Sequence, residues 1–235
     1  MALNLPGLKA WWRAANGPGA RDFLRARAHF RERWPDGPIA AQDYVVFDCE
    51  STGLRPSEGD RLLSLGAVRV RNAEPVAEFA TLVNPGRPIP PASIRYHGIT
   101  DARVAGAPAA PEALAAFAAF AGDDVLVAHS AAFDRTLLYM EEHHGAPALP
   151  NAFLCSAVTS LWLDPAEHDH SLDGLCGRLG IVIQGRHEAL GDARATAELW
   201  VQLLARAGAR GVEDLADLVR RTRMEARMAE SAEHF

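Results

Sequence analysis

The chain has 235 residues, 49% of them hydrophobic and 23% charged, with a formal net charge of -6, as is typical of a globular protein with a sizeable core. No apolar run reaches the roughly 18 residues of a membrane span, and Met1 to Ala20 lacks the apolar core of a secretory signal, so we expect a cytoplasmic protein with no membrane contact. Three cysteines without a CxxC pair argue against a disulfide framework or a structural zinc site.

The charge is distributed unevenly along the chain. Proteins that bind nucleic acid usually carry a basic excess, so the acidic total argues against that class. Residues 1–42, however, hold seven basic and three acidic residues. We predict a basic helical extension and linker over residues 1–41, with the linker at Pro35 to Pro38. Its tryptophans and arginines could hold a nucleic acid strand or pack on the main domain, and the sequence leaves both readings open.

The main domain is predicted over residues 42–207 and begins with strands. Tyr44 to Phe47 is a β-branched and aromatic run that is typical of a buried strand. Two further strands, Leu62 to Arg71 and Val76 to Val83, are joined by a short polar turn around Asn72. Three strands with such short connections indicate an antiparallel meander.

Helices alternate with short strands in the second part of this domain. Val125 to Ala128 is a further buried strand, and the predicted helices have helical periodicity with clear stop signals. These helices span Pro111 to Ala121, Phe133 to His144, Ser171 to Leu179 and Ala189 to Ala207. The pattern predicts an α/β layered domain. A charged helix over residues 208–235 is expected to pack on this domain or to extend from it.

The segment FDCESTG, residues 47–53, carries two acids separated by one residue. Because side chains alternate along a strand, Asp48 and Glu50 project from one face and Cys49 from the other. Neighbouring carboxylates repel each other, and a divalent cation between them removes the conflict. Their oxygen ligands suit Mg²⁺ or Mn²⁺. The alternative is a strand end with two solvated acids.

Two later segments place acids at the starts of helices. In HSAAFD, residues 129–134, a buried strand leads into a helix with Asp134 in its first turn, near a strand end where α/β sheets build sites. In HEALGD, residues 187–192, His187 lies on a loop and Asp192 opens the long helix. A histidine ordinarily titrates near neutral pH, which suits removal of a proton from water. The alternatives are acids that favour helix N-termini and an ordinary loop histidine.

Taken together, these segments resemble a known family. The motifs FDxExTG, HxxxFD and HxxxxD are similar to those of the DEDDh 3′–5′ exonucleases, a family that includes the proofreading epsilon subunit of bacterial DNA polymerase III. The stretches NPG at 84–86, HGITD at 97–101 and LDGLCGRLGI at 172–181 resemble that family as well. The resemblance covers about Asp43 to Ala207. It implies a ribonuclease H-like mixed sheet, an antiparallel meander plus parallel strands, flanked by helices.

The resemblance also implies an activity and the residues that carry it. Asp48, Glu50, Asp134 and Asp192 would bind two divalent cations, Mg²⁺ or Mn²⁺, and His187 would take the proton of the attacking water. The expected reaction is the release of 5′-mononucleotides from DNA 3′ ends in replication proofreading or repair. The residues implied to bind or support the substrate are Thr52, Gly53, Leu54, His97, Ile99, His129 and Phe133. Of these, Phe133 could instead belong to the core, and His129 could simply brace the strand end.

Two positions depart from the pattern of this family. Ser130 stands where the family often has asparagine, and Cys155-Ser156 stands where an Asp-Thr pair is common. Neither replaces an implied metal ligand. The expected partner is a nucleic acid 3′ end, with single-stranded DNA favoured, and a polymerase subunit is a second candidate. The alternatives are an exoribonuclease resembling RNase T or oligoribonuclease, and an inactive module that binds nucleic acid or a polymerase.

Overall fold

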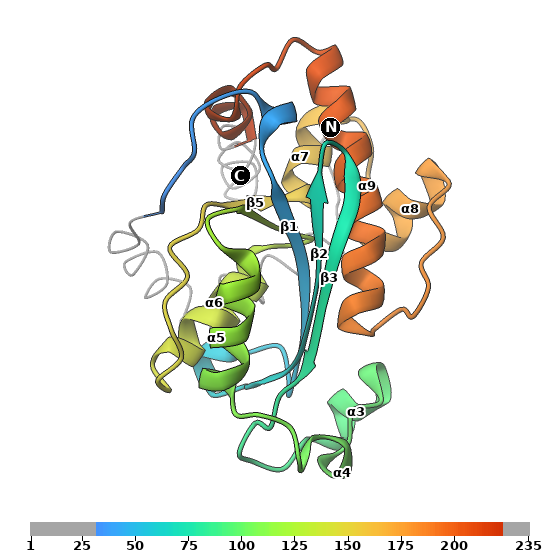
Figure 1. Ribbon diagram of the computed structural model, residues 1–235. Coiled ribbons are helices and arrows are strands. Elements are labelled where there is room, and N and C mark those ends of the chain that lie inside the picture. Colours follow the sequence, from blue (N-terminus) through green and yellow to red (C-terminus); the bar gives the residue numbers. More distant parts are fainter. Residues whose placement is uncertain (1–31, 223–235) are drawn as a thin grey trace, which may run out of the picture.

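The structure, a computed structural model, describes residues 32–222 and builds them around a five-stranded sheet in the order β3-β2-β1-β4-β5 (Figure 1). β1 pairs antiparallel with β2, as β2 does with β3, whereas β1 and β4, and β4 and β5, pair in parallel. This arrangement confirms the predicted mixed sheet. The strands are β1 (Tyr44–Ser51), β2 (Leu62–Arg71), β3 (Glu74–Leu82), β4 (Val125–Ala128) and β5 (Phe153–Cys155).

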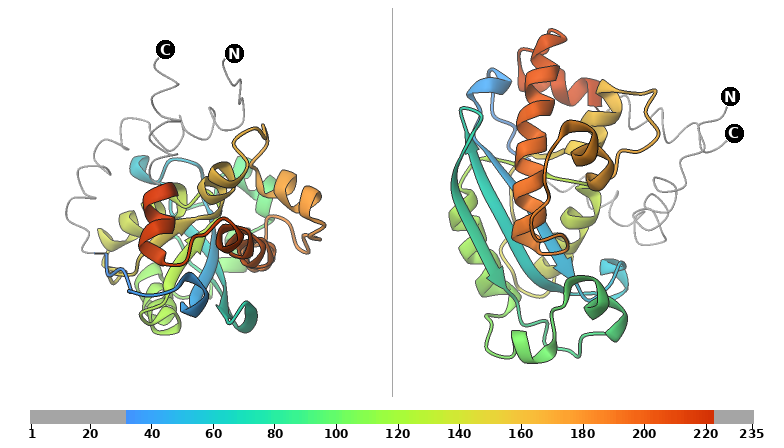
Figure 2. Two further views of the ribbon diagram at one scale, coloured as in Figure 1. Left: turned by 90° about the horizontal axis from the view of Figure 1, so that it is seen from above. Right: turned by 90° about the vertical axis from the view of Figure 1, so that its right-hand side faces the viewer.

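Helices cover both faces of the sheet (Figures 1 and 2). α5 and α6 pack on one face, whereas α7, α8 and α9 lie on the other, and a third small cluster joins α3 and α4 to β2. The helices are α3 (Pro91–His97), α4 (Asp101–Val104), α5 (Ala110–Ala121), α6 (Ala132–Glu142), α7 (Ser156–Leu163), α8 (Leu172–Leu179) and α9 (Ala189–Ala209), with 3-10 turns η1 (Ile39–Ala41) and η2 (Pro56–Glu58).

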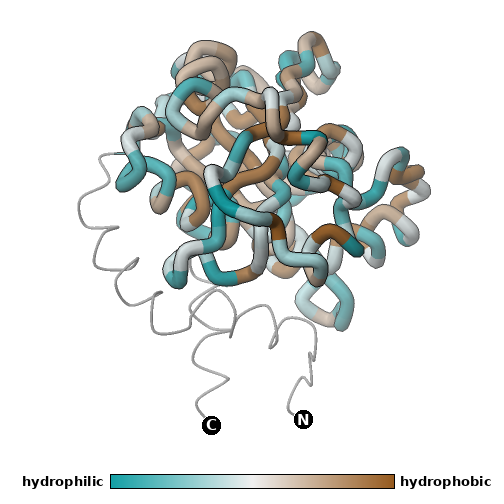
Figure 3. Tube along the Cα trace, turned by 90° about the horizontal axis from the view of Figure 1, so that it is seen from below, coloured by the Kyte–Doolittle hydropathy of each residue, from teal (hydrophilic) through white to brown (hydrophobic). Residues whose placement is uncertain are grey.

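Strand β1 divides the hydrophobic core into two parts. Val45, Phe47 and Cys49 belong to the cluster with α5 and α6. Tyr44 and Val46 belong to the cluster with α9. Since side chains alternate along a strand, the next two positions on the α9 side of β1 belong to the acids of the FDxE motif. Hydrophobic stretches run through the middle of the molecule when it is viewed from the end at which α3 and α4 lie (Figure 3).

The observed elements differ from the predicted ones at several places. β1 extends to Ser51, four residues beyond the predicted Phe47. β3 begins at Glu74 because Asn72 and Ala73, with φ of 52° and 64°, complete a tight turn directly after β2. Four short elements, α3, α4, β5 and α7, have no counterpart among the predicted ones. β5, for example, has only three residues, too few to show an alternating pattern.

A glycine on β2 determines how closely α9 approaches the sheet. Gly66 pairs with Asp48 across the β1–β2 ladder. A Cβ atom at this position would lie only 2.2 Å from the backbone nitrogen of Leu190, at the start of α9. No side chain fits in that space, so the first turn of α9 rests directly on the strand. This contact brings the N-terminus of α9 next to the acids of β1.

The segments before β1 and after α9 pack against each other. The backbone N–H of Ile39 donates to the carbonyl of Glu213 over 2.9 Å. Residues 215–222 are helical, and Leu215, Leu218 and Val219 are buried in the cluster around α9. Residues 1–31 and 223–235, which hold most of the predicted basic extension and the end of the charged helix, lie outside the described residues. The domain boundaries at 41 and 207 therefore stay predictions. None of the helices described here has the length and apolarity to span a bilayer.

Candidate active site

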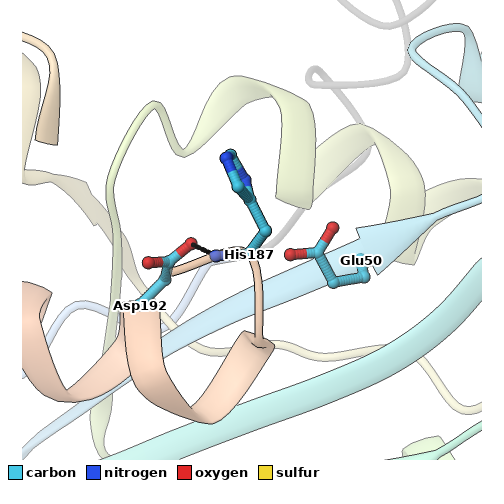
Figure 4. A group of neighbouring side chains, drawn as sticks. All are labelled: Glu50, His187 and Asp192. Carbon is cyan, nitrogen blue, oxygen red and sulfur yellow. Dashed lines mark hydrogen bonds between the residues drawn. The ribbon is translucent and has the colours of Figure 1, made fainter. Parts of the chain in front are cut away.

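Five residues from three separated parts of the sequence meet at one end of the sheet. Ligand atoms of Glu50, His187 and Asp192 all lie within 4.8 Å of one another. Glu50 reaches from β1 toward the start of α9, where the other two side chains lie (Figure 4). Asp48 and Asp134 are close enough to this group for their charges to interact with it. The structure thus brings together all five residues that the motifs singled out.

Asp48 is half-buried near the end of β1, and Asp134 lies fully buried close to it. Asp134 is 3% exposed and lies in the first turn of α6, as predicted. Burial raises the pKa of Asp48 well above its usual range, and the charges of Asp134 and Glu50 raise it further. Burial also raises the pKa of Asp134 to about 7. Hydrogen bonds from Cys49 oppose that shift, because they favour the charged form of Asp134.

The other two carboxylates, Glu50 and Asp192, show the same tendency. Burial, followed by the charges of Asp192 and Asp134, raises the pKa of Glu50 to about 8. Burial also raises the pKa of Asp192, and the guanidinium of Arg186 opposes this shift. Repulsion from neighbouring carboxylates therefore contributes to the raised pKa values of Asp48 and Glu50. A bound cation would remove this repulsion.

The two oxygens of Asp192 have different surroundings, and this difference tests whether a metal fits. Oδ2 accepts hydrogen bonds from Nη1 of Arg186 and from the backbone N–H of His187. Oδ1 is buried, and within residues 32–222 it has no hydrogen-bond partner. An unpaired buried carboxylate oxygen is costly, and a hard divalent cation satisfies it. The donor set of carboxylates with one imidazole therefore fits such an ion.

The turn after β1 carries the first three predicted substrate-binding residues. Asp60 holds this turn, because its carboxylate accepts from the hydroxyl of Thr52 at 3.0 Å and from the backbone N–H of Arg55 at 2.9 Å. A Cβ atom on Gly53 would lie 2.4 Å from that carboxylate, so a larger residue there would displace Asp60 from these contacts. Leu54 projects outward and is 69% exposed. The turn therefore presents a rigid backbone with one free apolar side chain.

A groove of about 310 Å³ begins at His187 and extends along β2 and β3. His97 and Ile99, both predicted to bind substrate, line it together with Arg103. His97 is fixed because its Nδ1 accepts from the backbone N–H of Ile99 over 3.0 Å. Tyr96 lies beside the groove with its ring centroid 6.2 Å from that of His187, and it is 71% exposed. An exposed aromatic ring next to a polar groove is a feature that can bind a planar ligand.

The last two predicted substrate-binding residues have structural contacts instead. Nδ1 of His129 lies 2.9 Å from the hydroxyl of Ser156, the first residue of α7. Burial lowers the pKa of His129 to about 4, so its imidazole is neutral at physiological pH. Phe133 packs against the core between the sheet and α6. Both residues support the strand end and helix that position Asp134, and their roles in substrate binding stay predictions.

Sequence reasoning did not identify several residues of this site. Arg186 and Asp173 form an ion pair beside Asp192, and Ser156 accounts for one of the two departures from the family pattern by binding His129. The second departure, Ser130, has φ of 63° between β4 and α6. Arg186 directly precedes His187, but arginine is frequent throughout this chain. Its identity alone therefore gave no signal.

Comparison with known proteins gives matches over the same region. The family model RNase_T, described as Exonuclease, matches residues 45–200. A DNA polymerase III subunit epsilon-like protein of Rhodobacter capsulatus is 44% identical over 195 residues, which cover 81% of this chain and 28% of that protein. The PolC-type DNA polymerase III of Bacillus subtilis is 33% identical over 177 residues, covering 74% of this chain and 12% of that protein. The chain thus spans less than a third of the length of these relatives.

Solved structures match the fold as well. Exonuclease X in complex with 5′ overhanging duplex DNA has a TM-score of 0.58 and 27% identity, and the match covers 70% of this chain and 93% of that one. The nuclease domain of 3′hExo, a DEDDh family member bound to rAMP, has a TM-score of 0.64 and 18% identity, covering 72% of this chain and 94% of that one. These likenesses confirm the predicted ribonuclease H-like sheet.

Proposed function

The chain belongs to the exonuclease family, and from that premise we propose that it is a metal-dependent 3′–5′ exonuclease that releases 5′-mononucleotides from DNA 3′ ends. The observation that carries this proposal is the convergence of four carboxylates and one histidine beside an open groove. A group of this kind has the ligands for divalent cations and a base for water in one place.

The proposal assigns the four carboxylates as ligands of two divalent cations, Mg²⁺ or Mn²⁺. Asp48 is the proposed shared ligand, because the charges of the other three carboxylates all act on it. When bound, the cations would supply Lewis-acid polarisation of the phosphodiester and neutralise its charge. Oδ1 of Asp192, buried and unpaired among the residues described, supports this assignment.

His187 is the proposed general base, since it lies on a loop at the edge of the carboxylate group. Its imidazole would accept the proton of the water that attacks the terminal phosphodiester. The groove lined by His187, His97 and Ile99 would receive the terminal nucleotide. The turn from Thr52 to Leu54, after β1, would contact the same nucleotide from outside that groove. Tyr96 and Leu54, both largely exposed, would contact the bases.

DNA is the proposed substrate, because the relative with 44% identity is named as a DNA polymerase III subunit epsilon-like protein. A role in replication proofreading or repair, a polymerase subunit as partner and a cytoplasmic location belong to the same proposal. RNA is the alternative substrate, since the 3′hExo nuclease domain was solved with rAMP. An inactive module that binds nucleic acid or a polymerase is the second alternative, and the complete set of five site residues argues against it.

A nuclease panel tests the proposal. Wild type and Asp48→Ala would be incubated with matched single- and double-stranded DNA and RNA, in Mn²⁺, in Mg²⁺ and in excess chelator. We expect mononucleotide release from DNA 3′ ends by the wild type only, and only with metal. Equal activity of Asp48→Ala, or activity in chelator, would contradict the metal-dependent assignment. Faster degradation of RNA would establish the alternative substrate, and a folded wild type inert on all 3′ ends would establish the inactive module.

A further inference from the structure

Arg186 connects two acids that belong to different helices. Its guanidinium makes a bidentate pair with Asp173 on α8, with Nε 3.1 Å from Oδ1 and Nη2 3.0 Å from Oδ2. Its remaining nitrogen, Nη1, donates to Oδ2 of Asp192 on α9. The planar fork of an arginine can make these contacts simultaneously, whereas a lysine supplies a point charge. One side chain thus holds the starts of α8 and α9 together.

The contact to Asp192 decides which oxygen of that carboxylate is free. Oδ2 already accepts from Arg186 and from the backbone N–H of His187, so it is fixed by two donors. Oδ1 is left buried and unpaired within the part of the chain that the structure describes. The Asp192 side chain is only 4% exposed, so water competes little for these contacts. Arg186 therefore fixes the orientation of the Asp192 carboxylate, which is a proposed ligand of the cation.

The same arginine restrains the loop that carries the proposed base. His187 follows it directly and has φ of 64°, a conformation that side chains other than glycine seldom adopt. A Cβ atom on Gly191 would lie 2.2 Å from the carbonyl oxygen of Gly185, so the loop packs tightly against the first turn of α9. Such a strained conformation persists only where surrounding contacts hold it. The Asp173–Arg186–Asp192 contacts are of this kind.

We propose that Arg186 is a positioning residue, anchored by Asp173, which aims Oδ1 of Asp192 at a bound divalent cation and holds the loop of His187 in place. The inference rests on the proposed function, since it assigns the cation and the base to that site. It differs from a surface ion pair because the arginine is partly buried and its charge acts on Asp48 and Glu50 as well as on Asp192. Partners that orient metal ligands typically contribute 10–100-fold in metal affinity or activity, which is the range of effect expected here.

The test measures Mn²⁺ binding directly, by calorimetry and by the electron paramagnetic resonance signal of free Mn²⁺, together with kcat and KM. Arg186→Gln should weaken Mn²⁺ binding by about 10-fold or more and lower kcat more than it raises KM. Arg186→Lys should show a smaller loss than Arg186→Gln but should not reach wild-type values. Lysine keeps the positive charge but cannot donate to Asp173 and Asp192 in the same planar geometry. Asp173→Asn should show a smaller loss of the same kind and add little to Arg186→Gln in the double variant.

Arg194→Gln is the matched control, because Arg194 lies on α9 near Asp192 and pairs with the exposed Glu78 in the bidentate way that Arg186 pairs with Asp173. It should leave Mn²⁺ binding and kcat within about twofold of wild type. Circular dichroism would establish that each variant folds, and Arg186→Lys and Asp173→Asn carry the test if Arg186→Gln does not fold.

Three results would overturn the inference: Mn²⁺ binding by Arg186→Gln within twofold of wild type, tighter binding by that variant, or full recovery in Arg186→Lys. Tighter binding would mean that the guanidinium only competes with the cation for Asp192. A wild type that binds no Mn²⁺ and cuts no 3′ end would overturn the proposed function together with the inference. A wild type that does both beside an unchanged Arg186→Gln would overturn the inference alone.

Discussion

The backbone N–H of His187 donates to Oδ2 of Asp192 over 3.1 Å, so the proposed base and a proposed metal ligand belong to one hydrogen-bonded unit. The contact involves the backbone of His187 and leaves its imidazole free to face the groove. A change of the His187 side chain can therefore remove the base without removing the donor that fixes Asp192. This separation makes the two roles experimentally distinguishable.

His187→Ala should lower kcat by about 10²–10⁴-fold, the usual contribution of a general base, while Mn²⁺ affinity changes much less. The backbone donor to Asp192 is retained in this variant. Single-turnover kinetics and Mn²⁺ titration would measure the two effects. His144→Ala is the control and should behave as wild type, because His144 is exposed and follows the C-terminal end of α6, whereas Asp134 lies at its N-terminal end. If Mn²⁺ affinity fell in parallel with kcat, His187 would be a ligand rather than the base.

In a chelator, the carboxylate group should make the protein less stable as the pH rises from about 5 to about 8. The pKa of Glu50 is raised to about 8 and that of Asp134 to about 7, so in this window the folded state binds more protons than the unfolded state. Ionisation then forces repelling charges together. Thermal unfolding should show a falling Tm, and a change of 1 kcal/mol corresponds to about 2–4 °C in a domain of this size.

Glu50→Gln should flatten that pH dependence, because it removes one of the titrating groups, and saturating Mn²⁺ should flatten it in the wild type. Glu167→Gln, at an exposed glutamate between α7 and α8, should leave the slope unchanged. The electrostatic account would be wrong if chelated Glu50→Gln and wild type lost stability with pH to the same extent.

Glu141 should be important for stability, although it lies outside the carboxylate group. Its side chain is 1% exposed and accepts from Nε and Nη2 of Arg61, at 2.9 and 2.8 Å, and from the backbone N–H of Leu62 at 3.0 Å. Glu141→Ala should lower the free energy of unfolding by about 3–5 kcal/mol, since it leaves a partly buried cation unpaired. Urea denaturation would measure this loss.

Glu78→Ala provides the comparison for Glu141→Ala, because Glu78 forms an equally bidentate pair with Arg194 at the surface. Exposed pairs contribute about 0–1 kcal/mol. Equal losses in the two variants would show that burial does not distinguish the pairs. Since Glu141 lies on the helix that carries Asp134, a destabilised α6 should also weaken Mn²⁺ binding.

Tyr96→Ala should raise KM for oligonucleotides by a larger factor than it lowers kcat, because the exposed ring lies beside the groove and contacts His187 only edge-on. Stacking of a base on an aromatic ring contributes about 1–3 kcal/mol, which corresponds to at least about fivefold in KM. Tyr96→Phe should retain wild-type KM. Val76→Ala, at an exposed apolar position on β3, is the control. An unchanged KM in Tyr96→Ala would exclude the ring from substrate contact.

The parts of the site that sequence reasoning predicted are those with local patterns. The alternation of side chains along the predicted strand placed Asp48 and Glu50 on one face. The helix starts predicted at Phe133 and Ala189 placed Asp134 and Asp192 in first turns, and the observed helices begin at Ala132 and Ala189. A strand end and a helix start each depend on a few adjacent residues. Their positions could therefore be inferred without knowledge of the remaining fold.

The parts that could not be predicted depend on contacts between distant segments. Glu141 contacts Arg61, 80 residues away, and no periodicity in either segment indicates that pair. Arg186 lies on the loop between α8 and α9 and contacts Asp173 near the start of α8, and nothing in the sequence indicates how that loop folds back. β5 was missed because its backbone pairing with β4 stabilises a strand of only three residues.

Gly66 determines whether the residues of the active site can assemble at all. It carries no chemical group, yet its missing Cβ allows the backbone of α9 to touch the strand opposite Asp48. Direct contact between two main chains therefore sets the distance between the proposed ligands on β1 and the one on α9. A backbone, unlike a side chain, cannot rotate away to relieve a clash. A methyl group at this position would move one ligand away from the others and leave every reactive residue in the sequence unchanged. An inventory of acids and histidines would then identify an intact nuclease in a protein whose site could no longer assemble.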